Sequence, residues 1–271
     1  MQPSTRRLTR ERRIFTRKTE GSKSLSRGLV LLRAFLEGAP VLTNQQLAER
    51  TGTPKPTVSR LTRSLVEAGF LEYDFVSEGY RLASVCLSLG RAFRFAHSEF
   101  NPVRALLQEV ARREKVNVGL SVPDGCSMVY LETVREAPGS HLRLIAPGWR
   151  LDMASTSAGH AYIAALPAGR RREVLERLRI RRQSNWLPLK KGITTSIKSV
   201  STLGYCWWKP ISEIEAIACP MQGPDGSILC LNFSYPARTD SEHYREKLSS
   251  VLISLALEIR REFEQLEPLR E

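Results

Sequence analysis

Apolar residues in the first third of the chain recur at helical spacing. Leu25, Leu29, Leu32 and Leu36 lie three or four residues apart, and Gly38 follows where a helix would end. This spacing places the four side chains along one stripe of an α-helix. The pattern therefore predicts a first helix that ends before the glycine.

A second, shorter helix is predicted to begin after Thr43. Thr43 can cap its N-terminus, and Gln46 stands three residues further on, which is the spacing of a capping box. Leu42 and Leu47 flank the cap as a hydrophobic staple, and Gly52 ends the helix about two turns later. A third helix follows at once, so the segment has the order of a helix-turn-helix.

The third helix is predicted to begin at Pro54, with Thr53 as its N-cap. At 100° per residue, one side carries aliphatic side chains that should pack inward. These are Val58, Leu61, Leu65 and Ala68. The other side and the leading turn carry Lys55, Pro56, Thr57, Ser59, Arg60 and Arg63. Hydroxyl and guanidinium groups can bind phosphates and guanine edges in the major groove; taken by itself, a solvated charged face is the alternative.

Two short alternating runs around a glycine turn follow the third helix. Residues 70–74 and 80–82 flank Ser77-Glu78-Gly79, which predicts a β-hairpin that would form a wing. The tip carries Glu78 and no lysine or arginine, so we expect Arg81 to be the wing's contact with the DNA backbone. The expected DNA contacts are Thr43, Gln45, Lys55, Thr57, Ser59, Arg60, Arg63 and Arg81.

An apolar stripe lies on the segment after this predicted domain. It predicts a linker helix within residues 84–99. The stripe can pack against the same helix of a second subunit or against its own domain, and the pattern leaves both open. Its members are Val85, Leu89, Ala92, Phe93 and Ala96.

Helix-like and strand-like segments are interspersed through the remainder, residues 100–271. The pattern predicts a helix that opens at Asn101-Pro102 and a final helix from Thr239, with a capping box to Glu242. Between them we predict strands at 116–122, 127–134, 141–146, 214–221 and 227–234, and helices at 156–166, 168–180 and 193–203. Hairpin strands in one sheet with flanking helices indicate an α+β domain, and the whole chain is predicted to be an α+β protein of two domains.

The formal net charge of +13 is concentrated near the N-terminus. Residues 1–27 contain nine lysines and arginines against two glutamates. This block predicts a basic, disordered arm at 1–23, ahead of a winged helix-turn-helix domain at 24–83. Nucleic acid is the commonest partner of such an arm.

Several other classes of protein are disfavoured. The five cysteines form no C-x-x-C pair and have no histidine at metal-ligand spacing, so we expect reduced thiols, no metal and no cofactor. No apolar run approaches the roughly 18 residues of a membrane span, and no secretion signal is present, so we expect a cytoplasmic protein. Ser157 with His160, or Cys219 with His243, could form a nucleophile and base, but no catalytic motif accompanies either pair, and we expect no enzyme.

Three segments resemble the winged helix-turn-helix of the IclR family in order and spacing. They are SLSRGLVLLRAF, LTNQQLAERTGTPKPTVSRLTRSLVEAGFLE and GYRLASVCLSLGRAF, within residues 24–95. Residues 100–265 resemble the family's effector-binding domain, which is itself similar to GAF and PAS sensors. The resemblance implies a transcriptional regulator that binds a partly palindromic double-stranded operator as a homodimer or a dimer of dimers.

The segment from Leu151 to Ala161 carries small and hydroxyl residues before a predicted helix N-terminus. Free N–H groups at such an end favour a carboxylate, and plain N-capping is the alternative. The resemblance implies an effector cavity lined by Leu151, Ser157, Ala158, Ala216, Asn232 and Ser234.

The sequence departs from the family pattern after Gly204. Many relatives have Gly-Tyr-x-x-Asp-x-Glu there, whereas this chain has Gly204-Tyr205-Cys206-Trp207-Trp208-Lys209-Pro210. Trp208 and its neighbour could form an aromatic wall for a planar ligand or simply fill the cavity, and Lys209 could pair with a carboxylate. We therefore expect a regulator whose operator binding responds to a carboxylate or aromatic acid. The alternative is a ligand-independent regulator whose second domain serves only oligomerisation.

Overall fold

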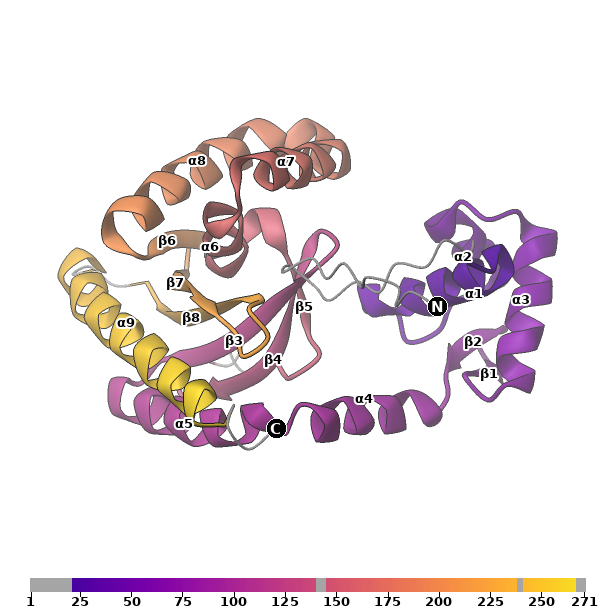
Figure 1. Ribbon diagram of the computed structural model, residues 1–271. Helices are drawn as coiled ribbons and strands as arrows, with labels where there is room; N and C mark the ends of the chain where they lie inside the picture. The colour runs from indigo at the N-terminus through magenta and orange to yellow at the C-terminus, as the bar shows by residue number, and fades with distance from the viewer. Residues whose placement is uncertain (1–20, 140–144, 238–240, 267–271) are drawn as a thin grey trace, which may run out of the picture. The chain divides into compact units, whose positions relative to one another are not determined.

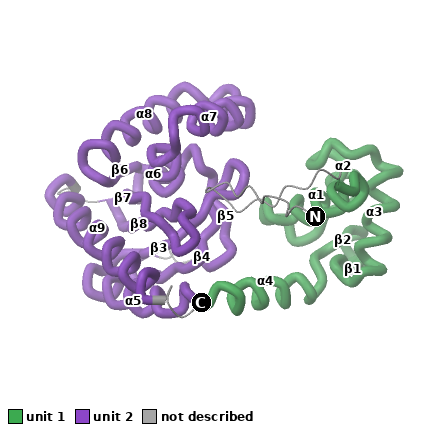
Figure 2. Tube along the Cα trace, in the orientation of Figure 1, with its two compact units in different colours: residues 1–7, 15–98 green, residues 8–14, 99–271 purple. Residues whose placement is uncertain are grey.

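The computed structural model describes residues 21–139, 145–237 and 241–266. They divide into two compact units, with the boundary between Ser98 and Glu99 (Figure 2). The predicted basic arm, except for its last three residues, lies outside the described residues, as do the Thr239 cap and most of the strand predicted at 141–146. No helix in the described ranges is long and apolar enough to cross a membrane.

The first unit consists of three helices and an antiparallel hairpin, followed by a further helix. Its elements are α1 (Lys23–Ala34), the 3-10 turn η1 (Phe35–Glu37), α2 (Asn44–Thr51), α3 (Lys55–Glu67), β1 (Leu71–Asp74), β2 (Gly79–Leu82) and α4 (Val85–Ala96) (Figure 1). Leu31, Leu42, Leu47, Val58 and Leu71 are buried together in its core. The predicted winged helix-turn-helix is confirmed, with the hairpin as its wing.

Local signals position α2 as predicted. The Thr43 hydroxyl accepts a hydrogen bond from the Gln46 N–H (3.2 Å), and Gln46 Oε1 accepts one from the Thr43 N–H (2.9 Å). Gly52 ends the helix in the left-handed conformation, with φ of 63°. Two otherwise orphaned N–H groups are thus satisfied at the start of α2.

The start of α3 differs from the prediction by one residue. The helix begins at Lys55, and its N-cap is Pro54 rather than Thr53. The Pro54 carbonyl accepts the Thr57 N–H at 2.9 Å, and no side chain caps this end. A proline φ near −65° suits the cap and the first helical position alike, so the sequence does not separate the two.

The predicted packing face of α3 is partly wrong. Ala68, predicted to pack inward, is exposed because α3 ends there, and the side chain of Thr62 is buried instead. In α1 the leucine spacing predicted the helix correctly, but the leucines differ in burial. Leu31 is fully buried, whereas Leu25 and Leu29 are 63% and 51% exposed.

The second unit is built on one curled, antiparallel six-stranded sheet in the order β5-β4-β3-β8-β7-β6. The 3-10 turn η2 (Ser98–Phe100) and α5 (Asn101–Glu114) lead into it. The strands are β3 (Asn117–Asp124), β4 (Ser127–Arg135), β5 (Arg150–Asp152), β6 (Cys206–Ile211), β7 (Ile214–Gln222) and β8 (Ile228–Pro236). The helical segments are η3 (Met153–Ser155), α6 (Ser157–Ala165), α7 (Ala168–Arg182), η4 (Gln183–Asn185), α8 (Trp186–Leu203) and α9 (Ser241–Leu266).

Each face of this sheet carries its own hydrophobic core. On one face α5 and α9 cover residues such as Val118 and Phe233, and on the other α6, α7 and α8 cover residues such as Met128 and Ala218 (Figure 1). The predicted α+β sensor architecture is confirmed, and its GAF- or PAS-like character is consistent with it. We call the side toward α6 the α6 face.

Three elements of the second unit were not predicted correctly. The strands β5 and β6 were missed, because β5 is only three residues long and β6 contains Pro210 and no apolar alternation. Helix α8 was expected from residue 193 but begins at Trp186, with Pro188 in its first turn. Proline is tolerated there because the first-turn N–H groups have no partner within the helix.

Candidate DNA interface and ligand site

The outward face of α3 is open to solvent. Lys55, Ser59, Arg60 and Arg63 are exposed, and Thr57 is half-buried. Arg63 Nε lies 2.8 Å from Glu67 Oε1, with both side chains largely exposed. Such an exposed ion pair contributes little to stability, so a phosphate can displace the carboxylate. The side chain of Arg60 has no ion-pair partner in the described ranges.

Polar contacts that the sequence analysis did not predict hold α2 against α3. Asn44 Nδ2 lies 3.4 Å from Ser59 Oγ, and the buried Thr62 hydroxyl lies 3.5 Å from Asn44 Oδ1. Lys55 Nζ lies 3.4 Å from Oε1 of the exposed Gln45. Asn44 therefore helps to set how α3 is presented, although spacing alone gave it no role.

The wing carries less free positive charge than expected. Arg81 Nε lies 3.1 Å from Glu72 Oε2, and its Nη1 lies 3.6 Å from Asp74 Oδ2. At the tip Phe75 and Val76 are 86% and 96% exposed. The two carboxylates partly neutralise Arg81, so among the predicted DNA contacts the remaining cations are Lys55, Arg60 and Arg63 of α3.

The linker helix α4 buries none of its residues. In the predicted stripe, Leu89 is 53% exposed and Phe93 is 46% exposed, and Leu87 and Phe95 outside the stripe are exposed further still. The described chain therefore does not cover this stripe.

Three of the predicted effector residues lie in one row of directly opposed residues that runs across the strands on the α6 face. Arg135 of β4 lies opposite Asn117 of β3, which lies opposite Ser234 of β8. Ser234 lies opposite Ala216 of β7, which lies opposite Trp208 of β6. Residues opposed in this way bring their side chains within contact distance. Arg135 and Asn117 had not been predicted as part of the site.

The next row contains the predicted residue Asn232. Its neighbour across the β3–β8 pair is Gly119. A Cβ added at Gly119 would lie 2.2 Å from Tyr130 Cε1 and 2.8 Å from Asn232 Oδ1. The Tyr130 ring and the Asn232 amide therefore both lie over this glycine, where a larger residue would displace them.

Four polar atoms on the α6 face are buried without a hydrogen-bond partner in the described chain. They are Asn117 Nδ2, Arg135 Nη2, Trp208 Nε1 and Asn232 Oδ1. Leaving a buried donor or acceptor unpaired costs about 1–3 kcal/mol, and native proteins rarely do so without a reason. Unpaired donors and an unpaired acceptor that lie close together in two neighbouring rows of the sheet are typical of a surface that binds a polar ligand.

The remaining predicted effector residues lie at the edges of this surface. Leu151 is half-buried on β5, opposite Met128. Ser157 and Ala158 are buried in the first turn of α6, where the Cys206 thiol lies 3.4 Å from the Ser157 carbonyl oxygen. The Thr156 hydroxyl caps this end by accepting the Gly159 N–H, as the N-capping alternative anticipated.

His160 is fully buried. Its Nε2 lies 2.8 Å from the Ala154 carbonyl oxygen and its Nδ1 lies 2.9 Å from Ser196 Oγ. A carbonyl only accepts, so Nε2 carries the proton and Nδ1 accepts from the Ser196 hydroxyl. Burial lowers the pKa of His160 to about 4, against a smaller opposing effect of the hydrogen bond to Ala154.

Neither suggested nucleophile–base pair is assembled. Both ring nitrogens of His160 are engaged with other groups, so His160 offers no base to Ser157. Cys219 is buried against the α5 and α9 helices, whereas His243 is exposed. Burial also raises the pKa of the Cys219 thiol to about 12, which keeps it protonated.

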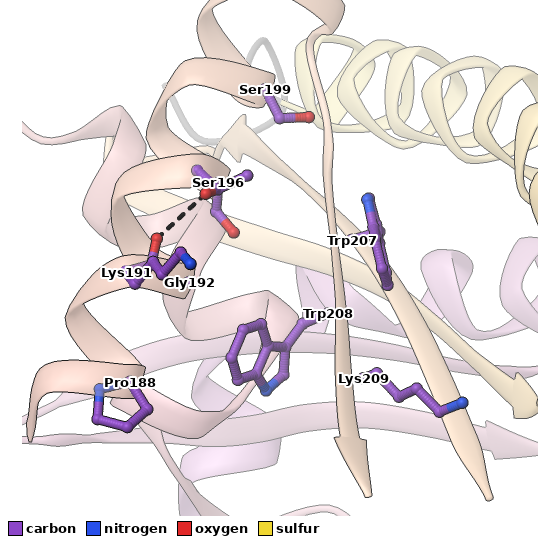
Figure 3. A pocket seen from close by; sticks show the side chains of 9 residues that line it. Pro188, Lys191, Gly192, Ser196, Ser199, Trp207, Trp208 and Lys209 are labelled. Carbon is purple, nitrogen blue, oxygen red and sulfur yellow. Dashed lines mark hydrogen bonds between the residues drawn. The ribbon is translucent and has the colours of Figure 1, made fainter. Parts of the chain in front are cut away.

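A groove of about 310 Å³ lies between α8 and the edge strand β6, and Trp208 is its only lining residue among the predicted effector contacts (Figure 3). The indole of Trp208 lies against α8, where a Cβ added at Gly192 would be 2.1 Å from its Cζ3. Its ring centroid is 4.7 Å from that of His160. Trp207 and Lys209 project on the other side of β6 (Figure 3), and Trp207 stacks with Arg245, whose Cζ is 4.5 Å from the ring centroid. Trp208 thus fills space between α6 and α8 on one side and borders the groove on the other.

Both units match models of one protein family. Residues 24–74 match the IclR helix-turn-helix domain, and residues 100–261 match the C-terminal domain of the bacterial transcriptional regulator IclR. The chain belongs to the IclR family. Members of the IclR family are DNA-binding transcriptional regulators.

Individual relatives agree with the IclR assignment. The HTH-type transcriptional regulator TsaQ1/TsaQ2 of Comamonas testosteroni is 32% identical over 185 residues, which is 67% of this chain and 66% of that protein. The Pca regulon regulatory protein of Pseudomonas putida is 25% identical over 252 residues, 90% of this chain and 85% of that protein. The crystal structure of an IclR family regulator from Brucella abortus has a TM-score of 0.78 and 31% identity, and covers 92% of this chain and 94% of that one.

Proposed function

We propose that this chain binds a partly palindromic operator through α3 and that a small organic acid, bound on the α6 face, changes its affinity for that operator. The observation that carries the effector half of the proposal is the group of four unpartnered buried polar atoms on that face. A ligand with polar groups would satisfy them and would bind the folded state selectively.

The class of effector has support from a structural neighbour. An IclR homologue from Microbacterium hydrocarbonoxydans, 19% identical with a TM-score of 0.68, was crystallised as a complex with 4-hydroxybenzoate. The α6 face of this chain combines apolar and polar surface, because the Tyr130 ring and the small residue Ala216 lie beside the polar groups. An aromatic acid could therefore contact the apolar part of this face with its ring and the polar part with its carboxylate.

The DNA half of the proposal assigns contacts to the exposed residues of α2 and α3, with Arg60 and Arg63 at its centre. A guanidinium can bind guanine O6 and N7 with two hydrogen bonds. We further propose that the exposed stripe of α4 packs against a second copy, so that two α3 helices reach two half-sites.

Footprinting of the full chain on the DNA flanking its own gene tests this function. The expected protection covers two related half-sites, and Arg60→Ala or Arg63→Ala weakens binding by roughly 1–3 kcal/mol. Arg177→Ala, which removes an exposed arginine of α7 in the second unit, is the matched control for loss of one positive charge. Folded variants that bind like the wild type would refute the assigned face, and protection of a single half-site would refute the dimer.

The effector is tested in the same assay with a panel of aromatic carboxylic acids that includes 4-hydroxybenzoate. At least one acid should change operator affinity at a concentration that also raises the melting temperature of the chain. If acids bind and operator affinity stays constant, the second unit serves oligomerisation and the effector proposal is wrong.

A further inference from the structure

Arg135 is a partly buried cation that has no counter-ion among the described residues. It is the last residue of β4, and its side chain lies on the α6 face, where its Nε donates to the Ile145 carbonyl (3.2 Å). Its Nη2 is buried and unpartnered, and no carboxylate of the described residues pairs with the guanidinium. By contrast, Arg150 and Arg182 in the same unit pair with Asp124 and Asp152.

The groups around Arg135 are neutral. Asn117 and Ser234 follow it in the cross-strand row. The guanidinium carbon lies 5.7 Å from the centre of the Tyr130 ring, and burial raises the pKa of Tyr130, so its hydroxyl remains protonated. Burial also lowers the pKa of Arg135, but a guanidinium remains charged at neutral pH. A charge held in such surroundings is costly unless an anion joins it.

Asn117 presents a second donor beside the guanidinium. Its Oδ1 accepts the Ala137 N–H at 3.1 Å, which fixes the amide so that Nδ2 is the free end. Nδ2 is buried and unpartnered, and Asn117 lies directly opposite Arg135 in the sheet. Two adjacent donors, one of them cationic, match the two oxygens of a carboxylate. One row further on, Asn232 Oδ1 offers a free acceptor.

We propose that Arg135, assisted by Asn117 Nδ2, binds the carboxylate of the effector and makes this site selective for anions. The inference rests on the effector function proposed above and assigns its charge recognition to one residue pair. A hydroxyl or amino group elsewhere on the ligand would donate to Asn232 Oδ1. The ligand class is thus an acid with a hydrogen-bond donor at a distance from its carboxylate.

The test compares an acid with its neutral isostere on the full chain. Wild type should bind 4-hydroxybenzoate more tightly than 4-hydroxybenzamide in isothermal titration calorimetry. Arg135→Gln should lower affinity for the acid on the order of 10- to 100-fold and leave affinity for the amide unchanged. Arg135→Lys keeps the positive charge but loses the planar guanidinium, so its affinity for the acid should lie between those of the wild type and Arg135→Gln.

Controls separate charge recognition from damage to the fold. Arg260→Gln removes an arginine that is 56% exposed and pairs with Glu264 on α9, and it should bind both ligands like the wild type. In a second readout, sodium formate should raise the melting temperature of the wild type more than sodium chloride at equal ionic strength. Arg135→Gln should lose that difference.

The outcomes distinguish this inference from the proposed function. If Arg135→Gln binds the acid as tightly as the wild type, or loses affinity for acid and amide equally, Arg135 does not recognise the charge. That result would leave the proposed regulation by an acid intact. If binding of the acid depends on Arg135 but the bound acid leaves operator affinity unchanged, the inference stands and the proposed regulatory function is wrong. Absence of any carboxylate-specific stabilisation of the wild type overturns the inference.

Discussion

Acidification should destabilise the second unit through His160. This imidazole is fully buried between α6, α8 and η3, and its pKa is lowered to about 4, from an ordinary value of 6.5. Between these two values the unfolded chain binds a proton that the folded chain does not. Stability contributed by the neutral ring is therefore present above pH 6.5 and falls as the pH drops toward 4.

The size of the effect follows from the two pKa values. At pH 5 the unfolded imidazole is almost fully protonated, whereas the folded one is mostly neutral. The resulting loss is about 2 kcal/mol relative to pH 7.5, and it would reach about 3 kcal/mol at still lower pH. A loss of this size is a substantial part of the stability of an ordinary domain.

Urea unfolding at pH 7.5 and pH 5.0, followed by tryptophan fluorescence, measures this loss. All four tryptophans lie after residue 98, so the signal reports the second unit alone. His160→Gln retains an amide donor for the Ala154 carbonyl and does not titrate, so it should lose about 2 kcal/mol less than the wild type over this range. His243→Gln, an exposed histidine of α9, is the matched control and should follow the wild type. Equal pH dependence in His160→Gln and wild type would refute the assignment.

Two further variants test local packing. Thr43→Ala removes the hydroxyl that caps α2 and should destabilise the first unit by about 1 kcal/mol in urea unfolding followed by circular dichroism. Thr53→Ala is the control and should have little effect, because Thr53 caps no helix. Equal losses of stability in the two variants would contradict the assigned cap. Gly192→Ala places a Cβ 2.1 Å from Trp208 and should cost roughly 1–3 kcal/mol with a shift in tryptophan emission; unchanged emission would mean that Trp208 does not pack there.

Local chemistry explains what could be predicted from the sequence. The capping box at Thr43, the left-handed glycine at position 52 and the helical spacing of α3 each act within a few residues. These interactions decide element type before any tertiary contact forms, so the helix-turn-helix was predictable from its own segment. The errors lay at the ends of elements, where Pro54 and Ala68 occupy caps.

The ligand site could be predicted only in part, because it depends on strand register. Asn117 and Ser234 are opposed in the sheet although more than a hundred residues separate them in the chain. Arg135 stands at the end of a predicted strand with no motif around it, and only the register brings it beside Asn117. That no described carboxylate pairs with Arg135 becomes visible only in the folded state, and the spacing of residues along the chain does not predict it.

The same row gives a bound acid an orientation. Its cationic end is Arg135 on β4, and its other end is the aromatic ring of Trp208 on β6, beside the small Ala216. Four strand spacings of about 4.8 Å separate the two ends, roughly 19 Å along the sheet. From Arg135 the remainder of the molecule would extend across β3 and β8, where Asn232 lies one row away, toward Ala216. Because Trp208 already occupies the space between α6 and α8, it limits how far a ligand can extend. We therefore expect Trp208 to limit ligand length and Arg135 to select for ligand charge.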